Sequence, residues 1–459
     1  MTVLTLTGLI LVIALLGYAM GVARSRSALQ AGSVLHSRPQ YSGAFVAFLF
    51  ALPAVCLMLA WVAIDEGIIR SLTIASLPSD VTEGIDRRQA GALIREVFQV
   101  ISGRTFGEPE PYMRDAAAYY VEAQGWSRTL MYVSCLALGA LCAGWGFSRI
   151  APEFRARNKV EAIVSGLLVL ASCIAILTTV GIIGALVFES WAFFTLVPVN
   201  EFLFGLNWEP QIPIREDQIA GAGAFGAVPV FWGTIFIALI SMMVALPIGL
   251  FSAIYLAEFA SPRVRTIVKP VLEILAGIPT IVYGFFAVLT VAPALRRYGE
   301  MVGLDVAANS ALAAGGVMGI MIIPFISSLS DDAITAVPRS LRDASLAMGA
   351  TRAETVSRVL LPAALPGIVG GVLLAVSRAI GETMIVVMAA GLIARLTLNP
   401  FEGVTTVTVQ IVTLLIGDSS FDNPKTLAAF GLGLVLFIST LGLNVFALNI
   451  VKKYRERYD

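Results

Sequence analysis

An arginine and a glutamate, Arg378 and Glu382, lie four residues apart within the apolar segment "GIVGGVLLAVSRAIGETMIVVMAAG". Arg378 comes eleven residues after the start of this segment, about 16 Å along a helix, near the middle of a membrane span. An arginine there costs at least about 2.5–3.5 kcal/mol, so it normally faces a cavity or a partner. Its planar fork suits phosphate or carboxylate oxygens, and Glu382 would orient it. The pair predicts an anion site, although an ion pair that only neutralises itself within the helix has the same pattern.

Three hydroxyl side chains are weaker candidates for the same substrate pathway. Thr280 follows Pro279, and Ser327 and Ser328 follow Pro324. A proline within a membrane helix frees backbone groups, so nearby hydroxyls can contact a polar substrate. Alternatively, these hydroxyls bond back to their own helix. The acidic pair at 331–332 is expected at the cytoplasmic membrane edge, and we assign it no role.

The sequence predicts neither a metal site nor a nucleotide site in this chain. The glycine-rich stretch "GAGAFG" (221–226) lacks the Gly-Lys-Ser/Thr ending of a phosphate-binding loop, and the sequence contains no Gly-Lys dipeptide. The four cysteines lie in apolar runs without metal-ligand spacing, and His36 is the single histidine. We therefore expect no cofactor in this chain; if ATP drives the protein, another chain hydrolyses it.

The composition is that of a membrane protein. Hydrophobic residues make up 58% of the 459 residues and charged residues 14%, against about 25% charged residues in soluble domains. Mean hydropathy is +0.85. The formal net charge of zero argues against a nucleic-acid partner, so the expected surroundings are lipid.

Nine segments are long and apolar enough to cross a membrane, which takes about 20 residues each. They lie near residues 3–22, 43–64, 129–149, 161–187, 230–257, 270–292, 309–330, 367–394 and 427–450. The sequence therefore predicts an all-α polytopic membrane protein with about nine transmembrane helices.

Basic residues in the short loops predict the orientation of these spans. Lysine and arginine dominate the loops 23–42, 151–160 and 258–269 and the C-terminal tail, whereas the 188–229 loop is mainly acidic. This pattern fits an outside N-terminus and a cytoplasmic C-terminus. Arg24 and Arg26 follow the first span rather than precede it, so we expect a retained anchor instead of a signal peptide. Residues 65–128 form the longest polar stretch, outside the membrane and with no predicted role.

The cytoplasmic segment "SLRDASLAMGATRAETVSRVLLPAALPG" (340–367) combines two Ser/Thr-x-x-Asp/Glu capping boxes with a glycine joint. The boxes pair Ser340 with Asp343 and Thr351 with Glu354. They predict helices at about 341–348 and 352–361, with Gly349 in the left-handed conformation that ends the first. Leu361-Pro362 is predicted to stop the second.

Both predicted helices carry modest apolar stripes. Leu341, Ala344 and Met348 share one face of the first helix, and Ala353, Val356 and Leu360 share one face of the second. Such stripes suit docking into a groove of a partner protein. A loop that packs against its own membrane bundle would carry the same pattern, and the residues alone leave both alternatives open.

This segment resembles the EAA loop of ABC importer permeases, Glu-Ala-Ala-x3-Gly-x9-Ile-x-Leu-Pro. Here the pattern reads Asp343-Ala344-Ser345, then Gly349, then Val359-x-Leu361-Pro362, with three conservative departures. In that family the loop fits a cleft on a cytoplasmic ATPase. The resemblance therefore implies coupling roles for Asp343, Ala344, Gly349, Thr351, Glu354, Leu361 and Pro362, and a permease core of about six helices.

A second set of motifs is similar to phosphate importer permeases of the PstC type. "SRAIGETM" (377–384) matches their Arg-Ala-x-Gly-Glu-Thr-Met signature, and further matches are "FLFGLNWEP" (202–210), "GIPTIVYGFF" (277–286) and "AVPRSLRDASLAMGAT" (336–351). Together these matches cover most of residues 195–395. The resemblance says little about residues 1–150, which we expect to be an N-terminal extension with about three spans ahead of a permease core at 151–459.

The resulting hypothesis is one transmembrane subunit of an ATP-driven phosphate importer in the bacterial cytoplasmic (inner) membrane. The resemblance implies four partners: a PstA-type permease, a PstB-type ATPase dimer that binds ATP and Mg²⁺, an extracytoplasmic phosphate-binding protein and phosphate itself. The ATPase is expected to act on the coupling loop at 331–366. A permease for sulfate or molybdate is the alternative nearest to this hypothesis. An ion-coupled secondary transporter with Glu382 as proton relay is the alternative from another class.

Overall fold

The computed structural model describes residues 3–30, 32–78, 81, 87–104, 109–210, 223–416 and 423–454. The chain forms two compact units, residues 1–177 and 178–459, and helix α6 (Ala156–Leu196) contains the boundary between them. Within the described ranges, nine helices are long and apolar enough to cross a membrane. The predicted all-α polytopic fold is confirmed; its only strands in these ranges are the two-residue β1 (Trp208–Glu209) and β2 (Ala224–Phe225).

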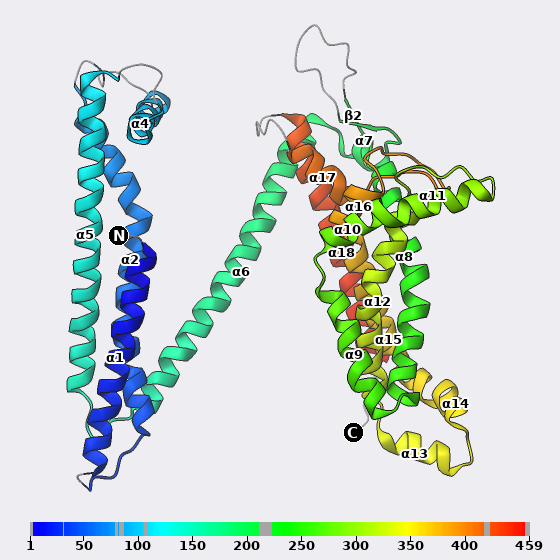
Figure 1. Ribbon diagram of the computed structural model, residues 1–459, viewed down its shortest axis with the longest axis horizontal. Helices are drawn as coiled ribbons and strands as arrows, with labels where there is room; N and C mark the ends of the chain where they lie inside the picture. The colour runs from blue at the N-terminus through cyan, green and yellow to red at the C-terminus, as the bar shows by residue number, and fades with distance from the viewer. Residues whose placement is uncertain are drawn as a thin grey trace. The chain divides into compact units, whose positions relative to one another are not determined.

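The first unit is built on three long helices that lie side by side (Figure 1). Its helices before α6 are α1 (Val3–Gln30), α2 (Pro39–Ala75), α4 (Arg87–Ser102) and α5 (Pro111–Ser148). The backbones of α1 and α2 meet at two glycines, because a Cβ on Gly21 would lie 2.9 Å from the Cα of Gly43. Leu6, Phe50 and Cys135 are buried where the three helices pack together.

The two ends of the predicted polar stretch, 65–128, continue the long helices on either side of it. α2 runs on to Ala75 and α5 begins at Pro111, so both helices extend beyond the predicted span limits near 64 and 129. Between them lies the helix α4, Arg87–Ser102. It packs on α5 and α2 through a small core that includes Ile69, Val97 and Tyr120.

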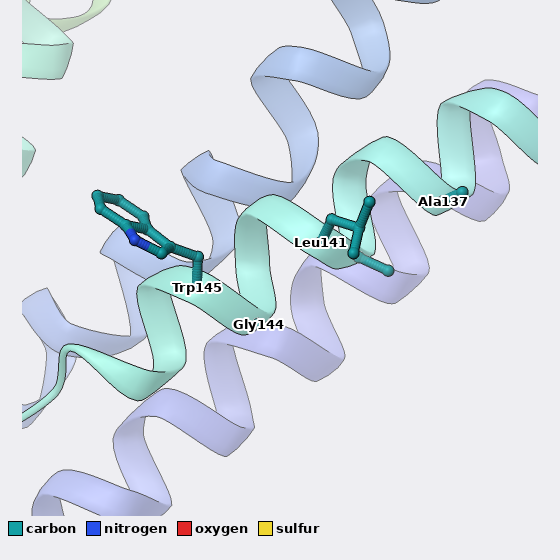
Figure 2. Close-up of a pocket in the computed structure, with 5 residues that line it drawn as sticks. Ala137, Leu141, Gly144 and Trp145 are labelled. Carbon is teal, nitrogen blue, oxygen red and sulfur yellow. The ribbon is translucent and has the colours of Figure 1, made fainter.

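An outward face of α5 carries a shallow apolar groove with no charged residue. Small residues form its floor, and the side chains of Leu141 and Trp145 project from the same side of the helix (Figure 2). The lining residues are Ala137, Ala140, Leu141, Gly144 and Trp145. A groove of this composition on a membrane-crossing helix suits an apolar neighbour, as expected within a bilayer.

The second unit contains the remaining elements. After α6 come α7 (Val199–Phe204), β1, β2, α8 (Val228–Ile254), the π-helix η1 (Tyr255–Phe259), α9 (Pro262–Gly277), α10 (Thr280–Phe286), the π-helix η2 (Ala287–Val291), α11 (Ala292–Met301), α12 (Ala311–Thr335), α13 (Arg339–Ala347), α14 (Arg352–Thr355), the π-helix η3 (Val356–Leu360), α15 (Leu361–Ile380), α16 (Met384–Ala389), α17 (Val407–Leu415) and α18 (Pro424–Tyr454). α13 and α14 lie at the end of this unit where α18 finishes, and α7, α11 and α17 lie at the other end (Figure 1). This arrangement agrees with the prediction that the 340–367 loop and the C-terminal tail share one side of the membrane.

α12 is the central helix of the second unit. It packs along α8 and against α15, and its buried residues include Met318, Ile322 and Ile326. Alanines and glycines of α12 let α8 approach closely; a Cβ on Gly315, for example, would lie 2.7 Å from Ile240. Within a bilayer the hydrophobic effect does not drive helices together. Small residues at the contacts let the backbones approach closely, and van der Waals packing then stabilises the pair.

Two predicted spans are not continuous helices. The predicted span 270–292 is interrupted at Ile278-Pro279, where α9 ends and α10 begins, and it turns π-helical in η2. The predicted span 367–394 was wrong at both ends, because the helix runs without a stop from Arg352 through η3 to Ile380 and a new helix begins only at Met384. This second break places Arg378 in the last turn of α15.

Candidate functional site

The glycine joint and the second capping box of the 340–367 segment are confirmed. Gly349 has a φ of +87°, in the left-handed region, and follows the end of α13. At the start of α14, the Glu354 amide donates to Thr351 Oγ1 at 3.3 Å, and the Thr351 amide donates to Glu354 Oε2 at 2.9 Å. Both halves of the box are therefore formed, and they fix where the chain turns between the two helices.

The first predicted box is not formed. Pro338, rather than Ser340, precedes the first residue of α13, and no side chain caps that helix. Pro338 has an extended ψ of 136°, and the helix begins directly after it, two residues earlier than the hydroxyl pattern indicated. Ser340 therefore lies inside α13 instead of capping it.

Pro362 does not stop the second helix either. The chain turns π-helical at η3, where the Leu361 amide donates to the carbonyl of Val356, and α15 then begins with Pro362 in its first turn. A proline lacks only its own amide donor, and this loss is tolerated where a helix begins. The wider π-turn just before the proline provides such a beginning without interrupting the helix, so Leu361 and Pro362 mark a change of helical register.

The two helices of the loop face different surroundings. Val356 and Leu360 are buried in the chain's own core, and Leu341 is half-buried against it. By contrast, Asp343, Ala344 and Met348 on α13 are exposed, and the Ser345 and Thr355 hydroxyls, 2.9 Å apart, join the two helices. The second helix thus packs on its own bundle, while the first leaves one face open to another protein.

Arg378 lies at mid-depth of the second unit. Its guanidinium carbon is 6.0 Å from the ring centre of Phe325, a residue near the middle of α12. That position is about 21 Å from Ala311 and about 15 Å from Thr335 at helical rise. The Arg378 side chain is exposed on the surface of this chain, and among the described residues it makes no hydrogen bond or ion pair.

The predicted ion pair between Arg378 and Glu382 is not formed. Because α15 ends at Ile380, Glu382 does not follow Arg378 by one helical turn. Its Oε1 instead accepts hydrogen bonds from the amides of Met384 at 3.1 Å and Ile385 at 3.5 Å, at the start of α16. Its carbonyl accepts from Thr408 Oγ1 at 2.8 Å. Glu382 therefore holds together the backbone turn after α15, and Arg378 keeps its charge available.

The three hydroxyl candidates lie in two different places. Thr280 is the first residue of α10, half-buried after Pro279. Ser327 and Ser328 line a small cavity beside Lys269 and Asp331. None of the three hydroxyls makes a hydrogen bond with the described part of the chain, so the alternative that they bond to their own helices gains no support here. Their roles stay predictions.

Sequence reasoning assigned no role to Asp331, which is the centre of a buried ion cluster. Its carboxylate accepts from Arg265 at 3.0 Å and from Lys269 at 2.8 Å, and the Asp331 side chain is only 3% exposed. The hydrogen bond to Asp331 raises the pKa of Lys269. The cluster ties α9 to α12 across 66 residues of sequence, and no local pattern signals a contact at that separation.

A second ion pair was also missed. Arg342 on α13 donates to Glu258 on η1, 84 residues earlier in the sequence. Arg342 stands directly before the Asp343-Ala344 motif, so its place in the loop was visible in the sequence. Its partner was not, because Glu258 lies at the edge of another span.

Comparison with known proteins identifies the family. Residues 8–178 match the family model described as "Phosphate ATP-binding cassette transporter", and residues 245–456 match "Binding-protein-dependent transport system inner membrane component". The chain is 33% identical over 286 residues to the probable ABC transporter permease protein YqgH of Bacillus subtilis, covering 62% of this chain and 86% of that protein. This chain belongs to the PstC-type family of ABC importer permeases.

Other relatives agree with this assignment. The phosphate transport system permease protein PstC of Xylella fastidiosa is 31% identical, over 54% of this chain and 76% of its own length. The probable PstC of Methanocaldococcus jannaschii is 30% identical, over 50% and 77%. A solved bacterial alginate ABC transporter is 15% identical, covers 64% of this chain and 98% of its own, and has a TM-score of 0.44. The family models and the relatives named PstC make this chain a multi-span permease subunit of the inner membrane, not an enzyme, which works with ATPase and binding-protein partners.

Proposed function

We propose that this subunit imports inorganic phosphate, which it receives from an extracytoplasmic binding protein and releases to the cytoplasm. The relatives named PstC support phosphate as the cargo. The observation that carries the proposal within this chain is the guanidinium of Arg378, which is exposed at mid-depth beside Phe325 and has no hydrogen bond or ion pair with the described residues. An arginine facing lipid at this depth costs at least about 2.5–3.5 kcal/mol, so this face requires a polar cavity or a second subunit. A phosphate oxyanion is a suitable partner for the free fork.

A second permease subunit of the PstA type would cover the Arg378 face, and two PstB-type ATPase subunits, which bind ATP and Mg²⁺, would dock on the 331–366 loop. The exposed face of α13 with Asp343 and Ala344 supports such a docking role. In this orientation the N-terminus lies outside and the C-terminus in the cytoplasm, in accord with the basic loops. Thr280, Ser327 and Ser328 are proposed to line the same pathway.

The arginine is tested by Arg378→Lys, which keeps a charge and loses the planar fork. Uptake should fall about tenfold or more, because hydrogen bonds to a charged group are worth about 1.5–3 kcal/mol each. Arg296→Lys on α11, where an exposed arginine pairs with Glu300, is the matched control and should transport normally. Normal uptake by Arg378→Lys in an assembled complex would remove Arg378 from the pathway.

The loop is tested by Gly349→Asp, measured as ATPase attachment and ATP-dependent uptake. The control is Gly303→Asp, because Gly303 also has a positive φ, of +75°, and also has open space where a Cβ would lie, but it follows α11 at the other end of the unit. We expect attachment or uptake to fail in the first variant and to survive in the second. Full activity of Gly349→Asp would contradict ATP coupling through this loop.

The two alternatives remain distinguishable by experiment. A sulfate or molybdate permease would use the same arginine, and competition by these anions identifies it. A secondary transporter would need Glu382 free to carry protons, whereas this carboxylate is engaged with the amides of Met384 and Ile385. Uptake that needs a proton gradient but no ATP would favour that alternative.

A further inference from the structure

The ion pair between Arg342 and Glu258 joins the exposed loop helix to a membrane-crossing helix. Arg342 lies on α13, and Glu258 lies on η1, the π-helical end of the helix that begins with α8. Their side chains are 29% and 10% exposed, so water screens this pair only weakly. The charges of Arg265 and Arg352 also act on Glu258.

α13 has few other attachments to the bundle. None of its residues is fully buried. Leu341 packs partly against the core, and Ser345 is hydrogen-bonded to Thr355, which belongs to the same loop. Arg342 therefore makes a charged contact between α13 and a helix distant from it in the sequence.

The pair also has room to adjust without breaking. Only one nitrogen of the Arg342 fork meets Glu258, while the Nε atom is buried and has no hydrogen-bond partner in the described structure. A small rotation of the carboxylate toward Nε would give the two-bonded arrangement that arginine and carboxylate favour. The π-turn that carries Glu258 is a type of backbone irregularity common at functional sites.

A displacement of Glu258 would be passed on to the centre of the bundle. The backbone of α8 at Gly249 lies directly against the Ile326 side chain of α12. A Cβ on Gly249 would lie 2.9 Å from that side chain. The next residue toward the N-terminus of α12 is Phe325, whose ring faces the Arg378 guanidinium. Asp331 on the same helix ties α9 to it through Arg265 and Lys269. Close packing of this kind has low compressibility and transmits strain.

We propose that the Arg342–Glu258 pair is the link that converts movement of α13 into movement of α8 and α12, so that it sets how much phosphate is imported per ATP hydrolysed. This inference rests on the proposed function. Arg342 and Glu258 are positioning residues, since neither touches the proposed substrate site.

The test is a set of variants in the complete transporter complex, reconstituted in vesicles with the binding protein. The measured quantity is phosphate imported per ATP hydrolysed, with ATPase attachment recorded separately. The key variant is the double substitution Glu258→Met/Arg342→Met, which removes both charges and leaves no unpaired buried ion. Arg342→Lys keeps a charge on α13, and Arg296→Gln removes an exposed charge from α11, at the other end of the unit, without touching the pair.

We expect the double variant to keep its ATPase and hydrolyse ATP while import per ATP falls about two- to thirtyfold, the range for residues that carry coupling between sites. Arg342→Lys should recover most of the ratio, and Arg296→Gln should equal wild type. A wild-type ratio in the double variant would overturn the inference, because a pair that only stabilises the fold is replaceable by two apolar side chains. Absence of ATP-dependent uptake in the wild-type complex would instead refute the proposed function.

Discussion

Replacement of Asp331 by asparagine should lower the free energy of unfolding of the permease core more than the same replacement at the neighbouring Asp332. The Asp331 carboxylate is buried and bridges Arg265 and Lys269, at 3.0 and 2.8 Å. Removing one partner of a buried ion pair typically costs about 3–5 kcal/mol. Here the two cations are 36% and 31% exposed and recover part of their hydration, and the new amide can still accept one hydrogen bond. We therefore expect a loss of about 2–3 kcal/mol.

This loss is measurable as a shift in the melting temperature of the purified complex in detergent. For a unit of this size, about 2–3 kcal/mol corresponds to a decrease of roughly 4–12 °C. Asp332→Asn is the matched control. Its neighbouring carboxylate is 67% exposed and lies 3.8 Å from Lys269, so its loss should cost no more than about 1 kcal/mol.

Equal melting temperatures for the two variants would refute this reasoning. That result would mean that burial of Asp331 does not strengthen its ion pairs and that α9 is held to α12 by other contacts. Recovery of the Asp331→Asn complex by a second substitution, Lys269→Met, would support the account, because it removes a cation that has lost its partner.

Two further variants test the packing and capping described above. Thr351→Ala removes a formed capping box and should cost about 1 kcal/mol, seen as faster amide hydrogen exchange at 351–355; exchange unchanged from wild type would contradict the role of the box. Gly233→Ala places a Cβ 2.0 Å from the carbonyl oxygen of Thr405 and should cost about 1–3 kcal/mol as overpacking, whereas Gly316→Ala, with nothing within 4 Å, should melt within a few degrees of wild type. Similar melting of the two alanine variants would contradict the close approach of α8 to the 404–406 segment.

Features that depend on a few neighbouring residues were predictable from the sequence. Membrane spans follow from local hydropathy, so the candidate helices were expected close to where they lie. The turn at Gly349 and the box at Thr351 and Glu354 are set within four residues, and both are present. The motifs that identify the family, such as those at 336–351 and 377–384, are likewise short contiguous stretches.

Features that depend on competition between local signals were predicted less well. α13 begins directly after Pro338, two residues before the start that the Ser340 hydroxyl predicted. At Pro362, a π-turn allowed the helix to continue where a proline alone suggested a stop. At Ile380 the helix ends although the sequence remains apolar, because Glu382 binds the amides of the next helix.

Contacts between distant parts of the chain had no sequence signal at all. Asp331 meets Arg265 across 66 residues, and Arg342 meets Glu258 across 84. A single sequence shows charges at these positions but does not show which of them are buried together. These two contacts depend on how α8, α9, α12 and α13 pack.

The most direct test of the account is uptake of radiolabelled phosphate by vesicles that contain the complete complex and its binding protein. The account predicts uptake that requires ATP, that is not competed by excess sulfate and that is lost in the Arg378→Lys variant. Uptake without ATP, or preferential uptake of sulfate, would contradict the central claim that this PstC-type permease is part of an ATP-driven phosphate importer.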